Sequence, residues 1–208
     1  MMDETLIRKK LGFLGPQLLD EILAHAQYRE IPADTEILRA GQYIKVIPLV
    51  IEGAIKVFTR FKDKELLLYY IRPEESCIMS FAASLKNTPS KVFALTEVDT
   101  SLLLLPISKI GRWFHNYAGF NELFFNLYNE RYVDLLDTIN QLLFNKLDQR
   151  VLDHLRAKQE IVGVSTIKIT HRQIAAELGT AREVISRIIK KLEKEQKLEQ
   201  LPEGIKVL

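Results

Sequence analysis

The residues best suited to contact another molecule lie on one side of a predicted helix near the C-terminus. On a wheel at ~100° per residue, one arc of about 140° carries Arg182, Glu183, Ser186, Arg187 and Lys190. The opposite arc carries Val184, Ile185, Ile188 and Leu192. An arginine can donate two hydrogen bonds to guanine O6 and N7, and a glutamate can accept from cytosine N4. The pattern therefore indicates a helix that packs through one side and reads base edges with the other.

A second short helix is predicted directly before this one. Thr170 can cap it, and Ile174, Ala175 and Leu178 share its apolar face. Gly179 then supplies a tight turn, and Thr180 with Glu183 is expected to form a capping box for the second helix. An alternative is a solvated helix in which Glu183 and Arg187 form an i,i+4 ion pair, with no DNA contact. The steep packing of two helices around Gly179 favours a helix-turn-helix.

The segment IKITHRQIAAELGTAREVISRIIKKLE resembles the DNA-binding domain of the cyclic-AMP receptor/fumarate-nitrate regulator (Crp/Fnr) superfamily. This resemblance implies dimeric bacterial transcription regulation, with Arg182, Glu183 and Arg187 as the base-reading set. Ala181 and Val184 stand where the cyclic-AMP receptor branch often has hydroxyls, which puts some phosphate anchoring in doubt. The residues expected to position the helix on DNA phosphate are Thr170, His171, Thr180, Ser186 and Lys190.

Charge is distributed unevenly along the 208 residues, which leave room for one large domain or two modest ones. Residues 146–208 contain 13 Lys+Arg against 9 Asp+Glu, a net charge of +4, and the remainder has a net charge of −2. The basic excess therefore lies with the helix-turn-helix, as phosphate binding requires.

Several classes of protein and site are disfavoured by the sequence. The single cysteine, Cys77, excludes an internal disulfide and a four-cysteine iron–sulfur cluster, and the four histidines lack metal-ligand spacing. Apolar runs are too short to span a membrane, and the N-terminus lacks the apolar segment of a signal peptide, so we expect a cytoplasmic protein. Neither paired acids nor a nucleophile–base set nor a phosphate loop stands out, which disfavours an enzyme, and we identify no cofactor.

The N-terminal part predicts helices followed by a small β-structure. Residues 1–29 have helical spacing that is broken at Gly15-Pro16. Seven short apolar runs then alternate with turn residues, which favours a small sandwich or barrel: YREI, EILRA, VIPLVIEG, AIKVFTR, ELLLYYI, KVFALTEV and TSLLLLPI. With Gly41 and Gly53 at turns, this half resembles the cyclic-nucleotide-binding β-roll of the same superfamily. The fold class is therefore α+β, with a jelly-roll-like sensor and a winged helix.

The nucleotide pocket departs from the family pattern. Members that bind cyclic AMP hold the ribose and the phosphate with a Gly-Glu pair and an Arg-Ser pair, but Ile78-Met79 and Ser90-Lys91 stand at these places. Without the carboxylate and the arginine fork, cyclic AMP is an unlikely effector. The motif Glu75-Ser76-Cys77 followed by Ser80 resembles a branch common in Bacteroidetes. The candidate effector-pocket residues are Glu75, Cys77, Ser80, Ser90 and Lys91.

Two interpretations of Cys77 remain open. An exposed, stabilised thiolate would allow redox or nitric-oxide sensing. A small buried hydrophobic residue is the alternative, and we favour it.

Residues 117–146 predict one helix of ~25–30 residues, about 40 Å long at 1.5 Å per residue. Its apolar stripe contains Phe125, Tyr128, Tyr132, Leu135, Ile139 and Leu142. The stripe would either cover the β-roll or pair with a second copy, and its length favours pairing. The family's dimerisation helix lies at the same place in the chain.

The C-terminal segment completes the predicted organisation. Residues 147–158 predict a further helix, residues 166–169 a strand, and the end of the chain a hairpin wing. We expect a β-roll at 1–115, a dimerisation helix at 116–146 and a winged helix at 147–208, with a recognition helix at 180–194. The expected function is sequence-specific transcription regulation by a homodimer on near-palindromic double-stranded DNA, with RNA polymerase as a further partner. The alternative is a cyclic-nucleotide or small-molecule receptor that acts mainly through protein partners.

Overall fold

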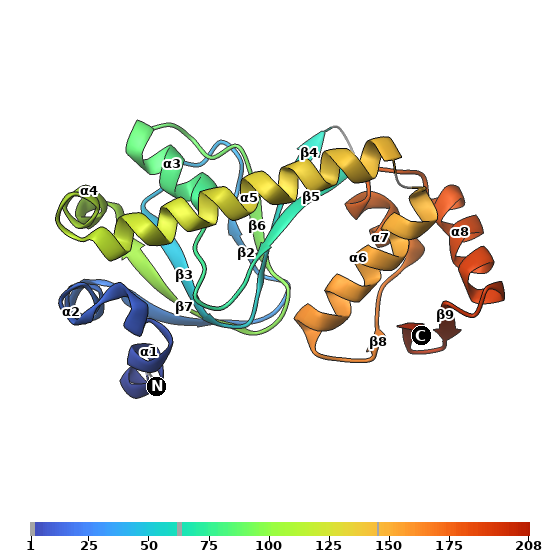
Figure 1. Ribbon diagram of the computed structural model, residues 1–208, viewed down its shortest axis with the longest axis horizontal. Coiled ribbons are helices and arrows are strands. Elements are labelled where there is room, and N and C mark those ends of the chain that lie inside the picture. The colour runs from blue at the N-terminus through green and yellow to red at the C-terminus, as the bar shows by residue number, and fades with distance from the viewer. Residues whose placement is uncertain (1–2, 62–63, 145) are drawn as a thin grey trace. The chain divides into compact units, whose positions relative to one another are not determined.

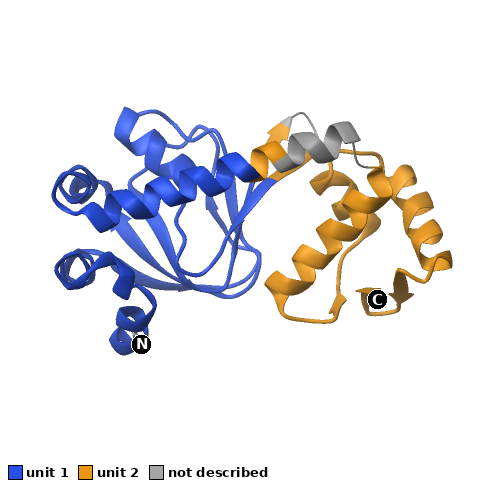
Figure 2. Cartoon of the chain, viewed as in Figure 1, with its two compact units in different colours: residues 1–58, 68–133 blue, residues 59–67, 134–208 orange. Residues whose placement is uncertain are grey.

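The computed structural model describes residues 3–61, 64–144 and 146–208, and the side chains within these ranges except those of 61, 64 and 137–144. The chain forms two compact units (Figure 2). Unit 1 comprises residues 1–58 and 68–133, and unit 2 comprises residues 59–67 and 134–208. A sheet-rich N-terminal part, a long helix and a C-terminal helix-turn-helix follow one another along the chain (Figure 1), as the sequence predicted.

The chain begins with three short helical segments: α1 (Glu4–Lys10), the 3-10 turn η1 (Gly12–Leu14) and α2 (Pro16–His25). The Asp3 carboxylate accepts from the Leu6 backbone N–H at 3.1 Å and so caps α1. Gly15 adopts a φ of 82°, and Pro16 then opens α2, where its missing N–H is harmless. The predicted break at Gly15-Pro16 is therefore confirmed.

All seven predicted strands are present, and they form two antiparallel sheets with the orders β1-β7-β3 and β2-β6-β4-β5. Gly53 sits in the turn between β3 and β4 with a φ of 88°, and a Cβ there would lie 2.5 Å from Asp99 O. The turn therefore requires glycine. The strands are β1 (Gln27–Ile31), β2 (Glu36–Leu38), β3 (Val46–Glu52), β4 (Ile55–Phe61), β5 (Lys64–Ile71), β6 (Phe93–Thr96) and β7 (Thr100–Pro106).

Unit 1 also contains α3 (Ile78–Lys86), α4 (Ile107–Asn116) and residues 118–133 of the long helix α5 (Ala118–Phe144), whose remaining residues belong to unit 2. The first turns of α5 pack on the roll through four buried side chains, Phe120, Leu123, Phe124 and Leu127. The Phe124 ring stacks on the Phe81 ring of α3, with centroids 3.8 Å apart. This aromatic contact fixes α5 against the roll through a side of the helix that is distinct from the predicted stripe.

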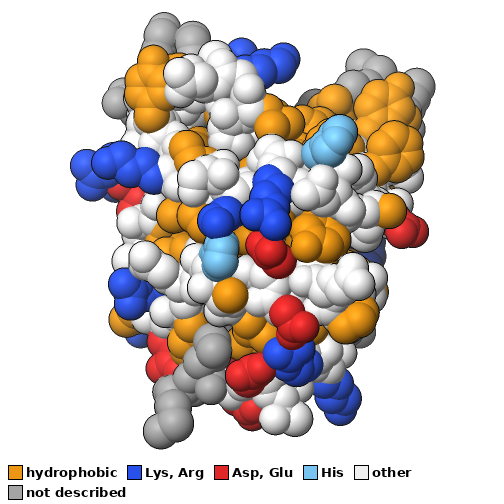
Figure 3. Space-filling view, turned by 90° about the vertical axis from the view of Figure 1, so that its left-hand side faces the viewer, with side chains coloured by type: hydrophobic (Ala, Val, Ile, Leu, Met, Phe, Trp, Pro, Cys, Tyr) orange, Lys and Arg blue, Asp and Glu red, His pale blue; other side chains and the backbone are white. Residues whose placement is uncertain are grey.

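The exposed end of unit 1 that contains α1, α2 and α4 carries acidic and basic side chains interspersed among hydrophobic ones (Figure 3). Two ion pairs on this surface, Arg8–Asp20 and Arg112–Glu21, join residues of opposite charge. Mixed charge of this kind lacks the basic excess that a DNA phosphate backbone attracts. Within the described residues, no helix is both long and apolar enough to cross a membrane.

Unit 2 contains a small three-helix domain closed by a sheet. Its apolar core joins α6 to the other elements through side chains such as Val151, Leu155, Ile174 and Ile185, each fully buried. The strands β8, β10 and β9 form an antiparallel sheet, so the predicted hairpin wing is confirmed. The elements are α6 (Leu147–Val162), β8 (Thr166–Ile167), α7 (His171–Glu177), α8 (Arg182–Lys194), β9 (Leu198–Leu201) and β10 (Gly204–Val207).

Candidate nucleic-acid interface

The first helix of the pair, α7, is closed at its N-terminus by a capping box. Gln173 N–H donates to Thr170 Oγ1 at 3.2 Å, and Thr170 N–H donates to Gln173 Oε1 at 2.8 Å. In this way two backbone N–H groups at the helix start, which have no partner within the helix, receive one. Thr170 was predicted to cap this helix, and the structure confirms it. The box with Gln173 was missed, although Thr-x-x-Gln is itself the sequence signal for it.

The turn between the helices forms as expected, but the second cap was predicted one residue too early. Gly179 adopts a φ of 67°, in the left-handed region that glycine enters without strain. Thr180 N–H donates to Ala175 O at 2.9 Å and ends α7. Ala181, in extended conformation, is the N-cap of α8 and makes no side-chain cap bond. The predicted capping box of Thr180 and Glu183 is therefore wrong, because the extra turn residue moves the Thr180 hydroxyl off the cap position.

The two sides of α8 differ as the wheel predicted. Ile185 and Leu192 are buried, and Val184 and Ile188 are half-buried. Ile189, which the prediction omitted, is fully buried and completes the inner side. It falls near the edge of the apolar arc, where a wheel separates inward from outward residues poorly.

The outer side of α8 presents Arg182, Glu183, Arg187 and Lys190 to solvent. Among the residues that the structure describes, no ion pair joins Glu183 to Arg187, and both side chains are exposed. Free guanidinium and carboxylate groups on one helix side keep their hydrogen-bonding capacity for a partner. The three base-reading candidates are thus brought together on one exposed surface.

His171 and Ser186, both expected to contact phosphate, lie in contact with each other. Their Nδ1 and Oγ atoms are 3.1 Å apart, and the Ser186 hydroxyl also donates to Arg182 O at 3.0 Å. With that hydroxyl hydrogen used, His171 Nδ1–H is the donor to Ser186 Oγ. This chain of bonds ties the start of α7 to the first turn of α8. The phosphate roles of Thr170, His171, Thr180, Ser186 and Lys190 stay predictions.

Comparisons with known proteins bear on this geometry. Residues 149–208 match the model of the Crp-like helix-turn-helix domain. Over 195 residues the chain is 25% identical to the cAMP-activated global transcriptional regulator CRP of Haemophilus influenzae, with 85% of this chain and 81% of that protein covered. The chain therefore contains a Crp-like helix-turn-helix domain at residues 149–208.

Two solved structures of regulators have the same fold. A transcriptional regulator of the crp/fnr family from Eubacterium rectale superposes with a TM-score of 0.82 at 24% identity, over 95% of this chain and 92% of that chain. The c-di-GMP responsive global regulator CLP of Xanthomonas campestris superposes with a TM-score of 0.76 at 17% identity, over 92% of this chain and 98% of that chain. These likenesses show that the chain shares the fold of these two regulators.

The five candidate effector residues of this chain do not form one site. Cys77 and Ser80 line a cavity of about 50 Å³ inside the β-roll, with mainly apolar neighbours. Ser90 is buried and bonds the backbone of Val92 through both its donor and its acceptor, at 2.9 and 3.1 Å. Lys91 is exposed. The cavity is far smaller than the ~300–1,000 Å³ of typical ligand pockets.

Glu75 takes part in a contact that the sequence did not reveal. Its Oε2 lies 2.7 Å from Arg131 NH2 of α5, and the Arg131 guanidinium lies 4.8 Å from the centre of the Tyr69 ring. Burial raises the pKa of the Glu75 carboxyl, although Arg131 opposes that shift. Burial likewise raises the pKa of the Tyr69 hydroxyl. The only hint of this contact in the sequence was that α5 contains a single arginine, Arg131.

Cys77 is a small buried residue, as the favoured interpretation held. Its side chain is 1% exposed, and its Sγ accepts from Ser80 N–H at 3.4 Å as the N-cap of α3. The Tyr69 hydroxyl lies 3.8 Å from the same sulfur. This enclosure differs from the exposed surroundings of reactive thiols.

The predicted dimer stripe lies on the uncovered side of α5. Phe125 is 76% exposed, Tyr132 61% and Leu135 54%, and Tyr128 is also exposed. Ile139 and Leu142 fall outside the side chains that the structure describes. The roll is covered by a different set of α5 residues, so the stripe remains available for a partner.

Proposed function

We propose that this chain is a transcription regulator of the Crp/Fnr type, which acts as a homodimer and reads a near-palindromic DNA site with one α8 helix in each of two successive major grooves. Arg182 and Arg187 contact guanine, and Glu183 accepts from cytosine and orients the arginines. The single observation that carries this proposal is the outer side of α8, where these groups are exposed without ion pairs to one another in the described structure. Recognition helices in such dimers are about 34 Å apart.

The proposed dimer contact is the exposed stripe of α5. Large apolar side chains in a row on one helix side are rare on a monomer surface and mark interaction sites. A second copy of α5 would cover Phe125, Tyr128, Tyr132 and Leu135. These residues recur at intervals of three and four, which is the spacing of a coiled-coil seam. The same symmetric pairing gives the two recognition helices the two-fold relation that a palindrome demands.

We propose that any effector acts by binding one of two dimer conformations better than the other, and that cyclic AMP is not that effector. The Haemophilus influenzae relative is cAMP-activated, but here the cavity inside the roll is about 50 Å³ and its polar lining is limited to Cys77 and Ser80. A cyclic phosphate buried among such side chains would lack matched donors. RNA polymerase is the proposed protein partner of the DNA-bound dimer. Because the dimer would act on chromosomal DNA, we expect it in the cytoplasm.

Selection of bound sequences from a random DNA pool tests the proposal, together with sedimentation of the free protein. We expect inverted half-sites with centres roughly 10 base pairs apart, and a dimer in solution. Affinity for the selected site should fall steeply with salt. If no sequence is enriched, and the protein binds DNA weakly and independently of salt, the results would instead favour a receptor that acts through protein partners.

A further inference from the structure

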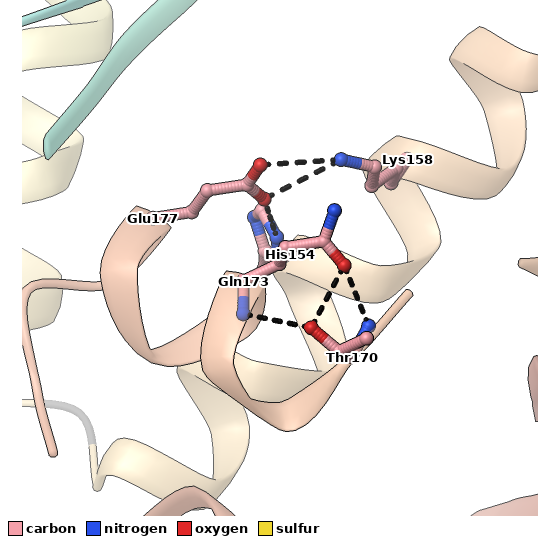
Figure 4. Close-up of polar contacts among 5 residues, drawn as sticks. All are labelled: His154, Lys158, Thr170, Gln173 and Glu177. Carbon is pink, nitrogen blue, oxygen red and sulfur yellow. Dashed lines mark hydrogen bonds and ion pairs between the residues drawn. The ribbon is translucent and has the colours of Figure 1, made fainter. Parts of the chain in front are cut away.

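Three charged or titratable side chains are buried together beneath the helix-turn-helix. Lys158 Nζ lies 3.3 and 3.5 Å from the two carboxylate oxygens of Glu177. His154 Nε2 lies 2.8 Å from Glu177 Oε2. Lys158 is 7% exposed, Glu177 is 6% exposed and His154 is 8% exposed. Figure 4 shows His154 and Lys158 reaching from α6 to the carboxylate at the end of α7.

The contact of His154 is electrostatic rather than a directed hydrogen bond. His154 Nε2 lies 2.8 Å from Glu177 Oε2, which is close enough for an ion pair. Within the described structure, however, Nε2 makes no well-aligned hydrogen bond. A lone pair on Nε2 would repel a carboxylate oxygen at this distance, so Nε2 carries a hydrogen. Glu177 is therefore held by Lys158 and by the Nε2–H edge of His154.

Stability alone does not explain this cluster. Charges removed from water lose solvation that their attraction often fails to recover, and apolar replacements of such clusters are frequently as stable or more stable. Glu177 also ends α7, where the partial negative charge of a helix C-terminus disfavours a carboxylate. The neighbouring contacts between α6 and α7 are apolar, with Leu155 and Ala175 in one core.

The position of the cluster indicates a geometric role. Apolar contacts are non-directional and leave a short helix free to slide or rotate. A carboxylate held by two groups one helical turn apart on α6 fixes the end of α7 in one place. Glu177 directly precedes Leu178, Gly179 and Thr180, which turn the chain into α8. At the other end, His171 and Ser186 tie the start of α7 to α8.

We propose that Lys158, Glu177 and His154 are positioning residues that set the angle of the recognition helix on α6 and thereby its fit to the operator. This inference rests on the proposed reading of DNA by α8. The cluster passes any movement of α6, the helix that follows α5, to the turn that aims Arg182 and Arg187. Its loss changes sequence discrimination more than it changes non-specific attraction to phosphate, because phosphate attraction depends on charge and little on helix angle.

The test compares full-length variants on the DNA selected by the wild type and on a scrambled duplex, with melting temperature measured in parallel. In the triple variant His154→Leu, Lys158→Met, Glu177→Leu, apolar packing replaces the whole cluster. The single variant Glu177→Gln removes the carboxylate charge that Lys158 and His154 contact. The control, Asp153→Asn with Arg156→Gln, removes an exposed ion pair of the same helix without changing net charge.

We expect Glu177→Gln to melt earlier and to lose sequence preference. The triple variant should melt at or above the wild-type temperature, yet its ratio of specific to scrambled affinity should stay about tenfold lower, similar to a mismatched base pair. A triple variant that discriminates like the wild type would show that the cluster is merely structural and overturn the inference. If the triple variant does not fold, Glu177→Gln decides: folded protein with wild-type discrimination also overturns it. A wild type without sequence preference would instead remove the proposed function itself, and the inference with it.

Discussion

At the scale of single residues, Arg182 and Arg187 on the outer side of α8 differ from several other cations of unit 2. Lys191 pairs with Asp148, Lys197 with Glu195 and Lys158 with Glu177. Arg182 and Arg187 instead extend into solvent. An arginine that is not engaged within its own chain keeps a planar fork of donors for a guanine edge.

Cys77→Ser tests the assignment of this residue as structural. We expect unchanged DNA affinity in reductant and after peroxide or nitric oxide, because the sulfur is enclosed and serine also caps helices well. The measurement is binding of the selected duplex by fluorescence anisotropy under each condition. A wild-type response to oxidant that disappears in the variant would show instead that Cys77 is a sensor.

Single-residue contacts were predictable where neighbours in sequence decide them. The Thr170 cap and the Gly179 turn follow from local chemistry, and the structure has both. The partners of Glu75 and Glu177 lie 56 and 19 residues away in the chain, so the sequence gives no sign of which residues meet. The Thr180 cap failed because helix starts shift easily by one residue.

At the scale of elements, Leu135→Asp tests the exposed stripe of α5. A charge in the proposed seam should shift the dimer to monomer and weaken binding to the two-half-site duplex, because burying an unpaired carboxylate is costly. Sedimentation velocity over a concentration series measures the shift. Asn126→Asp, about 150° from the stripe centre at ~100° per residue, is the matched control and should remain dimeric. Dimerisation equal to the wild type in both variants would refute the seam.

Asp148→Asn tests the tie between α6 and α8. The hydrogen bond from Lys191 lowers the pKa of the Asp148 carboxyl. A carboxyl whose pKa is lowered on folding adds stability above its unfolded pKa, and this is lost as the pH falls through the folded value. The variant should therefore melt earlier at pH 7, and the difference should fade below about pH 4. Thermal melts from pH 3 to 7 measure this, with Glu160→Gln as a control on the same helix. A difference that keeps its full size at pH 3 would exclude the ion pair as its cause.

The elements themselves were predictable because the two hydrophobic periods differ clearly in this chain. Seven strands and the pair α7 and α8 lie where the sequence placed them. The long helix was harder, since it has two apolar sides with similar spacing. Phe124 and Leu127 cover the roll, whereas Phe125 and Tyr128 are exposed, and neighbouring residues with the same chemistry gave no means to separate them.

At the scale of the whole molecule, charge and symmetry set what the two units can do. Residues 146–208 hold the basic excess of +4 within a chain of net charge +2. The phosphate attraction this gives is modest, so affinity should depend on two domains binding at once. A dimer would double the contacts and raise the effective concentration of the second domain.

The central claim is that the outer side of α8 reads base edges, and DNA selection with altered α8 tests it most directly. Wild type, Arg182→Ala and Arg187→Ala are each used to select from the same random pool, with Arg156→Ala on α6 as the control. Loss of one bidentate contact costs about 1–3 kcal/mol of discrimination, so each α8 variant should lose its preference at specific positions of both half-sites. The control should return the wild-type site. Recovery of that same site, at full strength, by both α8 variants would contradict the account.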